Sequence, residues 1–322
     1  MDRYTVVSHI GKGANSNVYS AIKDKKKVAL KVLQVRYGSQ TYMDLKTEIL
    51  VCERLGGLKG FCQLRDCFQN FSGQPGMVVL EFDLHVGDLA RHLNYEAARL
   101  NPLRVHNWIQ QLTSALGHMH TLRIMHRDIK PENILVSPQD KLVLADFGMA
   151  KLDAHAGETH SGYVVTRWYR PPEVLLRRPY CHKVDVWSMG CIIWEIRHCL
   201  ETREFVRFAA GDGSPQSPNK SGDLSNTQLM AVFRRIGTPA PAVLDELQLP
   251  PELRAMVDAT PFPSNYLIQD VYVEKLKPYF ELFPADRLAF GSTLTCCDLK
   301  PRHRAPYVVN RNRSLFEMIR AL

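Results

Sequence analysis

The sequence predicts an α+β protein with two unequal lobes: a small β-rich lobe that holds one helix, and a larger, mainly helical lobe. Short runs of valine, isoleucine and leucine, separated by glycine, asparagine, lysine and proline, fill residues 1–84, and such runs are typical of strands. From residue 85 the apolar residues recur at helical spacing. We therefore place the small lobe at 1–84 and the large lobe at 85–322, a length that suffices for a large core.

Four runs in the small lobe have the composition of strands: "YTVVSHIGKG", "NVYSAIK", "KVALKVLQV" and "GMVVLEF". Between the third and the fourth lies "MDLKTEILVCERL", which places Leu45, Ile49, Cys52 and Leu55 at helical spacing. The basic run "KDKKK" at 23–27 is interpreted as a solvated hairpin turn. We expect about five strands and one helix.

Two long periodic segments open the large lobe: "VHNWIQQLTSALGHMHTL" and "VDVWSMGCIIWEIRHCL". The second is apolar nearly all round, which predicts a buried central helix. The stretch at about 209–223 is dense in Gly, Ser, Pro and Asn and is predicted to be a flexible surface insertion. The run "RSLFEMIRAL" predicts an amphipathic helix at the end.

Composition favours a soluble protein of the cytoplasm or the nucleus. The chain shows neither a signal-like start nor a stretch of about 18 apolar residues. Its eight cysteines form no CxxC pair, so we expect reduced thiols in the structure rather than a zinc site. The formal net charge of +8 leaves nucleic-acid binding open. The basic residues form no single stripe with aromatics, however, so neither nucleic acid nor membrane is expected as a partner.

A glycine-bearing turn separates two predicted strands in "IGKGANSNVY". Gly11 and Gly13 would let backbone N–H groups approach phosphates closely. A plain hairpin is the alternative, because Ser16 replaces the third glycine of a GxGxxG pattern. A dinucleotide site is disfavoured since a strand follows, not a helix.

Lys31 lies in the middle of the strand-like run "VALKVL". A buried lysine is costly unless it is paired, and Glu48 of the following helix is a plausible partner. A lysine facing solvent at a sheet edge is the alternative.

The segment "IMHRDIKPENIL" concentrates charge between apolar flanks, a pattern that a solvated surface does not explain. Further along, "LVLADFGMAK" presents Asp146 at the end of another apolar run. Asn133 and Asp146 offer the oxygen ligands that Mg²⁺ prefers. Asp128 is placed to accept a hydroxyl proton.

In order, the chain shows a Gly-rich turn, VALK, HRDIKPEN, DFG and PPE. This set resembles the signature motifs of the eukaryotic protein kinases, from about residue 4 to Arg304. The resemblance implies a bilobal protein-kinase fold over residues 1–322, with ATP and Mg²⁺ as cofactors. It also implies structural roles for Asp185, which would anchor the HRD backbone, and for a Glu173–Arg304 ion pair.

The resemblance assigns the catalytic roles. Lys31 would hold ATP phosphates and pair with Glu48, while Asn133 and Asp146 would hold Mg²⁺. Asp128 would orient the attacking hydroxyl. Lys130 matches serine/threonine kinases, in which a lysine lies near the transferred phosphate. Because the set is intact, a catalytically silent kinase-like scaffold is only the alternative.

The same resemblance implies an adenine pocket with Leu80 as gatekeeper and residues 81–84 as the hinge that binds adenine through its backbone. Asp88 would contact the ribose. The full predicted ATP-binding set is Ile10, Gly11, Lys12, Gly13, Ala14, Asn15, Ser16, Val18, Ala29, Lys31, Leu80, Glu81, Asp83, Leu84, Asp88, Asn133, Leu135 and Asp146.

The segment "TRWYRPPE" resembles the CMGC group of kinases. Ser161 and Tyr163 lie where mitogen-activated kinases carry Thr-x-Tyr, so the resemblance implies regulation by phosphorylation from an upstream kinase. Surface hydroxyls that are never modified are the alternative. The basic residues expected to receive the phosphates are Arg127, Lys151, Arg167 and Arg170.

The resemblance implies protein substrates in which proline follows the serine or threonine. A divergent mitogen-activated kinase is the first sub-family prediction and a cyclin-dependent-like kinase the second. Obligate cyclin dependence is not expected, because "YMDLKTEI" around Glu48 differs from a PSTAIRE segment. Thr47 replaces an arginine that grips the loop phosphate in close relatives. The default prediction for the assembly is a monomer.

Overall fold

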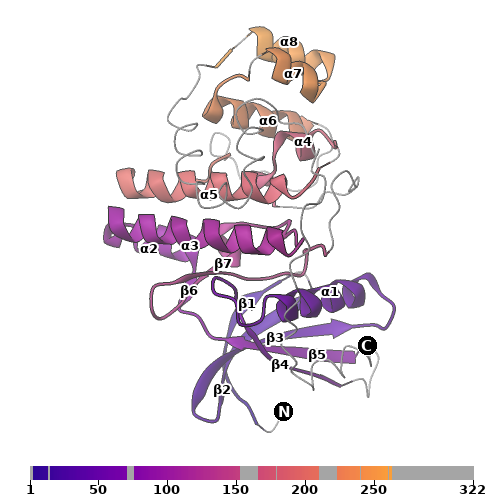
Figure 1. The fold of residues 1–322 in the computed structure, drawn as a ribbon, viewed down its shortest axis with the longest axis vertical. Coiled ribbons are helices and arrows are strands. Elements are labelled where there is room, and N and C mark those ends of the chain that lie inside the picture. The colour runs from indigo at the N-terminus through magenta and orange to yellow at the C-terminus, as the bar shows by residue number, and fades with distance from the viewer. Residues whose placement is uncertain are drawn as a thin grey trace.

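In the computed structural model the chain folds into a β-rich lobe and a mainly helical lobe, which confirms the predicted fold class (Figure 1). The structure describes residues 3–13, 15–70, 76–152, 166–178, 180–209, 223–239, 241–259 and 261–262.

The small lobe is a five-stranded antiparallel sheet in the order β1-β2-β3-β5-β4. Its strands are β1 (Thr5–Lys12), β2 (Ser16–Lys23), β3 (Lys26–Val35), β4 (Leu64–Asn70) and β5 (Gly76–Asp83). The helix α1 (Gln40–Arg54) lies against one face, as Figure 1 shows. The prediction of about five strands and one helix is confirmed.

Helix α1 begins where Ser39 caps it, since the side chain of Ser39 accepts a hydrogen bond from the Tyr42 amide at 3.2 Å. Leu45 and Ile49, one turn apart, are buried against Val78 and Leu80 of β5. Burial of side chains of this size contributes about 1.5–3 kcal/mol each. This packing fixes α1, and with it Glu48, over the sheet.

The register of β3 decides which side chains face α1. Because side chains alternate along a strand, Lys31 and Leu33 share the α1 face, and Leu33 packs in the same cluster as Leu45. Leu30 lies in a separate cluster on the opposite face. Lys31 is paired with Leu80 of β5 across the ladder. The sequence thus presents a lysine to α1 from the centre of a sheet.

The turn between β2 and β3 is the predicted hairpin, and both of its central residues have positive φ, at 48° for Asp24 and 64° for Lys25. A two-residue turn of this kind matches the twist of the strands. The interpretation of the whole run as solvated is wrong at Lys23. Its ammonium pairs with the buried Glu81 at 2.7 Å. Lys23 is the last residue of β2 and not part of the turn, so its side chain lies over the sheet.

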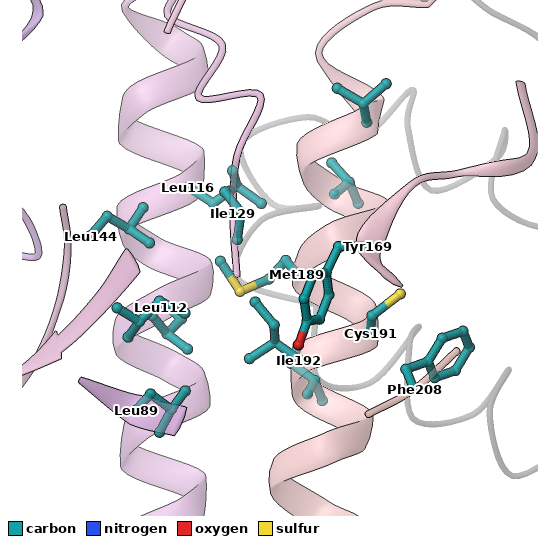
Figure 2. Close-up of a cluster of buried hydrophobic side chains, with 14 of the residues drawn as sticks. Leu89, Leu112, Leu116, Ile129, Leu144, Tyr169, Met189, Cys191, Ile192 and Phe208 are labelled. Carbon is teal, nitrogen blue, oxygen red and sulfur yellow. The ribbon is translucent and has the colours of Figure 1, made fainter. Parts of the chain in front are cut away.

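The large lobe is built around two antiparallel helices, α3 and α5. Figure 2 shows Leu112 and Leu116 of α3 facing Met189 and Ile192 of α5, with Tyr169 lying against α5. Twelve residues of α5 are buried, which confirms the central helix. The elements up to this helix are β6 (Gly87–Asp88), α2 (Leu89–Tyr95), η1 (Ala97–Arg99), α3 (Pro102–Thr121), η2 (Pro131–Asn133), β7 (Ile134–Val136), β8 (Leu142–Leu144), η3 (Arg167–Tyr169), α4 (Pro172–Leu175) and α5 (Lys183–Thr202).

Three further helices cover the far end of the large lobe (Figure 1): α6 (Asp223–Ile236), α7 (Pro241–Leu247) and α8 (Pro251–Ala259). The predicted insertion lies almost entirely outside the described residues, as do the run "RSLFEMIRAL" and Arg304. Within the described ranges, six cysteines are buried, and no helix is long and apolar enough to cross a membrane.

Candidate active site

Lys31 joins the two lobes through a three-residue charged cluster. Its ammonium lies 2.7 and 2.9 Å from the two carboxylate oxygens of Glu48 on α1, and 2.8 Å from Asp146 of the large lobe. Glu48 is buried, so this ion pair is shielded from solvent and strengthened by the low local dielectric. The predicted Lys31–Glu48 contact is therefore present, and the edge-lysine alternative does not describe this lysine.

The pKa values in this cluster follow from burial and proximity. Burial alone would lower the pKa of Lys31, but the carboxylates of Glu48 and Asp146 outweigh it and raise the pKa. Burial raises the pKa of Glu48, and Lys31 opposes that rise. At Asp146 burial acts upward, yet Lys31 more than offsets it, so the pKa falls below its ordinary value. Asp146 is the carboxylate of the cluster best kept ionised, as a cation ligand must be.

Asp128 is held in place by four polar contacts from three residues. Its Oδ2 accepts from the Lys130 ammonium at 2.6 Å and the Asn133 amide at 3.0 Å. Its Oδ1 accepts from the hydroxyl and the amide of Thr166, at 2.9 and 3.2 Å. The carboxylate orientation is thereby fixed at the loop that resembles the kinase catalytic loop. Thr166 is a site residue that the sequence analysis missed, although it opens the quoted motif "TRWYR".

The backbone of this loop is tied to the core by Asp185 of α5. The Asp185 carboxylate accepts from the amides of His126 and Arg127, each at 2.8 Å, and lies 3.1 Å from His120 Nε2. Burial pushes the pKa of Asp185 upward, but His120 and the other donors prevail and lower it. Arg127 has a φ of 64°, a left-handed conformation that costs a non-glycine residue about 1–2 kcal/mol. The predicted anchoring contact is present and holds this strained position.

Asn133 and Asp146 fit a magnesium ion by the chemistry of their donors. Asn133 Nδ2 donates to the carbonyl and the carboxylate of Asp128, which leaves the amide oxygen of Asn133 for a cation. The Ala145 amide donates to the Asn133 carbonyl at 2.9 Å, so Asn133 lies beside the residue that precedes Asp146. Within the described ranges no three His, Cys, Asp or Glu residues gather to hold a metal. Two protein ligands suit Mg²⁺, which is usually bound by few carboxylates together with substrate phosphates.

The glycine-bearing turn is closed by a hydrogen bond from the Gly13 amide to the Ser16 carbonyl at 2.8 Å. A Cβ at Gly13 would lie 2.7 Å from Ser16 Oγ, so a side chain there would require the Ser16 hydroxyl to move. Gly11 is paired with Val18 across the β1–β2 ladder. Ala14, also predicted to bind ATP, lies outside the described residues.

The acidic side chains of the predicted hinge are engaged in ion pairs. The Glu81 carboxylate pairs with Lys23, and Asp83 forms a bidentate pair with Arg65 at 2.9 and 2.6 Å. Both side chains are engaged within the protein, so only the backbone of these residues is left for adenine, as predicted. Leu80 is fully buried opposite Lys31.

Asp88 has a structural role that the sequence analysis did not include. It is the N-cap of α2, and its Oδ1 accepts from the Arg91 amide at 2.8 Å. One of its two carboxylate oxygens is therefore occupied, and the ribose contact stays a prediction that depends on the other.

The basic residues predicted to receive loop phosphates all lie in described parts of the chain. Arg127 Nε donates to the Met149 carbonyl at 2.7 Å. Lys151 exchanges backbone hydrogen bonds with Met125 at 2.8 and 2.9 Å, so it lies alongside the catalytic loop near Arg127. Arg170 is buried, and Arg167 opens η3. Ser161 and Tyr163 lie outside the described residues, so their regulatory role stays a prediction.

Two lobes joined by the Lys31–Asp146 ion pair, with Glu48 on the same lysine and with Asp128 fixed beside Asn133, define a protein of the kinase class. Comparison with known proteins agrees. Residues 4–204 match the protein kinase domain family, and the chain belongs to that family.

Curated relatives extend the likeness. Cyclin-dependent kinase 20 of Mus musculus is 31% identical over 308 residues, which cover 91% of this chain and 82% of the relative. The human MAPK/MAK/MRK overlapping kinase is 30% identical over 269 residues, which cover 82% of this chain and 58% of the relative. The chain is therefore a protein serine/threonine kinase of the CMGC group.

A solved structure shares the fold. One chain of the crystal structure of the yeast RNA Pol II CTD kinase CTDK-1 complex superposes with a TM-score of 0.66 at 24% identity, covering 87% of this chain and 86% of that one.

Proposed function

We propose that this kinase transfers the γ-phosphoryl group of Mg-ATP to serine or threonine side chains of protein substrates, with proline preferred after the acceptor. The observation that carries the proposal is Asp128, whose carboxylate is oriented by Lys130, Asn133 and Thr166. A base held this firmly at a known position is what proton transfer from a substrate hydroxyl requires.

The residues around Asp128 have separable tasks in this proposal. Asp128 accepts the proton as the hydroxyl oxygen bonds to phosphorus and the bridging oxygen leaves with ADP. Lys130, 2.6 Å from Asp128, offsets negative charge at the same point. Lys31, held by Glu48, would contact the phosphates of a bound nucleotide. Asn133 and Asp146 would hold Mg²⁺, which would neutralise charge on the phosphate oxygens.

We further propose that phosphorylation of Ser161 and Tyr163 regulates this activity. Support comes from Arg127 of the catalytic loop and from Lys151, whose backbone is bridged to Met125 just before that loop; both side chains are basic and can attract phosphate. Thr47 donates instead to Met43 of its own helix at 3.1 Å, so α1 lacks an arginine there to share that phosphate. The preference for proline rests on the likeness of "TRWYRPPE" to the CMGC group.

The sub-family and the cellular setting belong to the same proposal. The relatives named above are cyclin-dependent kinase 20 and the MAPK/MAK/MRK overlapping kinase, and the first supports the cyclin-dependent-like alternative. We propose activity in the cytoplasm, the nucleus or both. Transfer by the purified chain with and without added cyclins tests the first point, and fluorescence microscopy of the tagged protein tests the second.

The test of function is phosphate transfer from Mg-ATP to a degenerate Ser/Thr peptide library, with Asp128→Asn beside the wild type. The amide of asparagine cannot accept the proton, so we expect transfer to fall by about 10²–10⁴-fold. Asp258→Asn, on the surface of α8, is the matched control and should leave transfer unchanged. Equal rates for wild type and Asp128→Asn would contradict the assigned role, and a library profile without proline would contradict the proposed specificity. Prior phosphorylation of the loop separates an inactive scaffold from an enzyme that awaits activation.

A further inference from the structure

Arg207, in the segment that follows α5, forms a bidentate ion pair with Glu132 of η2. Its Nη1 and Nη2 donate to the two carboxylate oxygens of Glu132, and Nη1 also donates to the Tyr169 hydroxyl at 2.6 Å. Such fork-to-fork pairing is the geometry that a carboxylate offers to any guanidinium. Glu132 and Tyr169 therefore form a guanidinium-binding site.

Aromatic rings complete this site. The guanidinium carbon of Arg207 lies 4.9, 5.2 and 6.0 Å from the ring centroids of Phe205, Trp168 and Tyr169. Cations within about 6 Å of an aromatic face are attracted to it. A guanidinium that is paired with a carboxylate and flanked by three rings lies in a specific arginine pocket rather than in a chance surface ion pair.

The pocket is backed by a second acid. Tyr169 accepts from Arg207 and in turn donates to Glu195 of α5 at 3.0 Å. Glu195 is fully buried and also accepts from the Phe208 amide at 2.8 Å. Burial raises the pKa of Glu195 to about 8. The hydroxyl of Tyr169 is thus fixed as an acceptor toward whatever cation lies in front of it.

The pocket adjoins the place where a substrate hydroxyl must lie. Glu132 immediately precedes Asn133, and Trp168 lies two residues after Thr166, which bonds to Asp128. The side chain of Glu132 is 40% exposed and that of Arg207 is 20% exposed, and Trp168 is 39% exposed. A peptide held at Asp128 would therefore lie next to this pocket, which faces solvent and is occupied by Arg207.

We propose that Arg207 is a specificity-determining residue: it fills, from within the chain, an arginine-binding pocket of Glu132, Tyr169 and Trp168 beside the acceptor site, and so excludes a basic substrate residue there. The proposal rests on the proposed kinase function and deepens it. Removing Arg207 should free the carboxylate of Glu132 and create a preference for arginine at one position of the substrate. Arg207 acts on substrate choice and takes no part in the chemical step.

The experiment compares wild type with Arg207→Leu on peptides that carry arginine in turn at each position flanking the acceptor. We expect Arg207→Leu to prefer arginine at one position by about tenfold over wild type, the size of one charge-assisted hydrogen bond. Adding Glu132→Gln to the variant should remove that preference. Arg197→Leu, which removes a surface arginine of α5 that pairs with Glu201, should behave as wild type.

Each other outcome counts against the proposal. If Arg207 only stabilises the neighbouring loops, Arg207→Leu lowers transfer to all peptides equally. The ratio of the rates for peptides with and without arginine then equals that of wild type. A wild type that already selects arginine at that position overturns the proposal. Thermal unfolding of Arg207→Leu and of Arg207→Met establishes that the variants fold.

The proposed function can fail separately. If neither protein transfers phosphate, fluorescence anisotropy with labelled arginine peptides is the readout. Arg207→Leu should then bind the arginine peptide about tenfold more tightly than wild type, and equal affinity overturns the inference.

Discussion

Two buried glutamates, Glu48 in the small lobe and Glu195 in the large lobe, differ in the charge of the groups that donate hydrogen bonds to them. Glu48 is contacted by the ammonium of Lys31 at 2.7 and 2.9 Å, and the same ammonium reaches Asp146 in the other lobe. Glu195 is contacted by neutral donors, the Tyr169 hydroxyl and the Phe208 amide, all within the large lobe. Burial raises the pKa of both.

This difference indicates that the contact of Glu48 serves activity, whereas the contacts of Glu195 serve stability. The partner of Glu48, the Lys31 ammonium on β3, is shared with Asp146, so the contact depends on how α1, β3 and the large lobe are placed. The partners of Glu195 belong to segments packed on α5 and keep their place irrespective of the small lobe. We therefore expect changes at Glu48 to alter activity, and changes at Glu195 to alter mainly stability and its dependence on pH.

The largest effect is expected at a third carboxylate, Asp185, whose partners are mostly backbone amides. Asp185→Ala leaves the amides of His126 and Arg127 without their acceptor in a buried region, and we expect a loss of about 3–5 kcal/mol in the free energy of unfolding. Urea unfolding measures it. Asp185→Asn keeps one acceptor oxygen and should lose less, whereas Glu201→Ala on the surface of the same helix should change stability by less than about 0.5 kcal/mol. Similar losses in all three variants would contradict the view that Asp185 stabilises the protein by accepting from the amides of His126 and Arg127.

Glu48→Gln is expected to have the next largest effect. It leaves Lys31 bound to Asp146 alone, and the loss of one charge-assisted contact should slow phosphate transfer by about 10–100-fold. The free energy of unfolding should fall by only about 1 kcal/mol, because the amide retains the shape of the side chain. Transfer assays together with urea unfolding separate the two quantities. Glu53→Gln on the same helix is the control, and an equal loss of transfer there would mean that α1 responds to any change of charge.

The smallest effect over a single pH unit is expected at Glu195. Its pKa is about 8 in the folded protein, so the folded state retains a proton that an unfolded glutamate releases at its ordinary pKa of 4.5. The stability that comes from this proton is fully present below pH 4.5 and is lost as the pH rises through 8. Glu195→Gln removes the titration, so relative to wild type it should gain on the order of 1 kcal/mol per pH unit across that window. Urea unfolding of both proteins at several pH values measures the gain, and a constant difference between them would show that Glu195 stays ionised.

Much of the fold could be predicted because local sequence and packing agree. The strand runs and the helix around Leu45 and Ile49 have the right periodicity, and the packing of α1 on the sheet makes use of it. The contacts of Lys31 with Glu48, and of Asp185 with the catalytic loop, followed from motifs that the chain shares with a large family. The catalytic and ATP-binding roles of these residues stay predictions, since contacts alone do not test them.

The contacts that sequence reasoning missed join residues that are distant in the chain and belong to no shared motif. Arg207 and Glu132 are 75 residues apart, and nothing near Arg207 in the sequence distinguishes it from a surface arginine. Lys23 was assigned to a solvated turn because its neighbours are lysines, yet its ammonium reaches Glu81 on β5. Periodicity describes which face a residue occupies, not which partner lies across from it.

The pairing of β3 has a consequence for how this chain can change in length over evolution. β3 is hydrogen-bonded along its length to β2 on one side and β5 on the other. Inserting or deleting one residue within it would turn Lys31 toward the face that Leu30 occupies, away from Glu48. Variation in length near Lys31 should therefore be confined to the exposed turn at Asp24 and Lys25, where an added residue disturbs neither ladder.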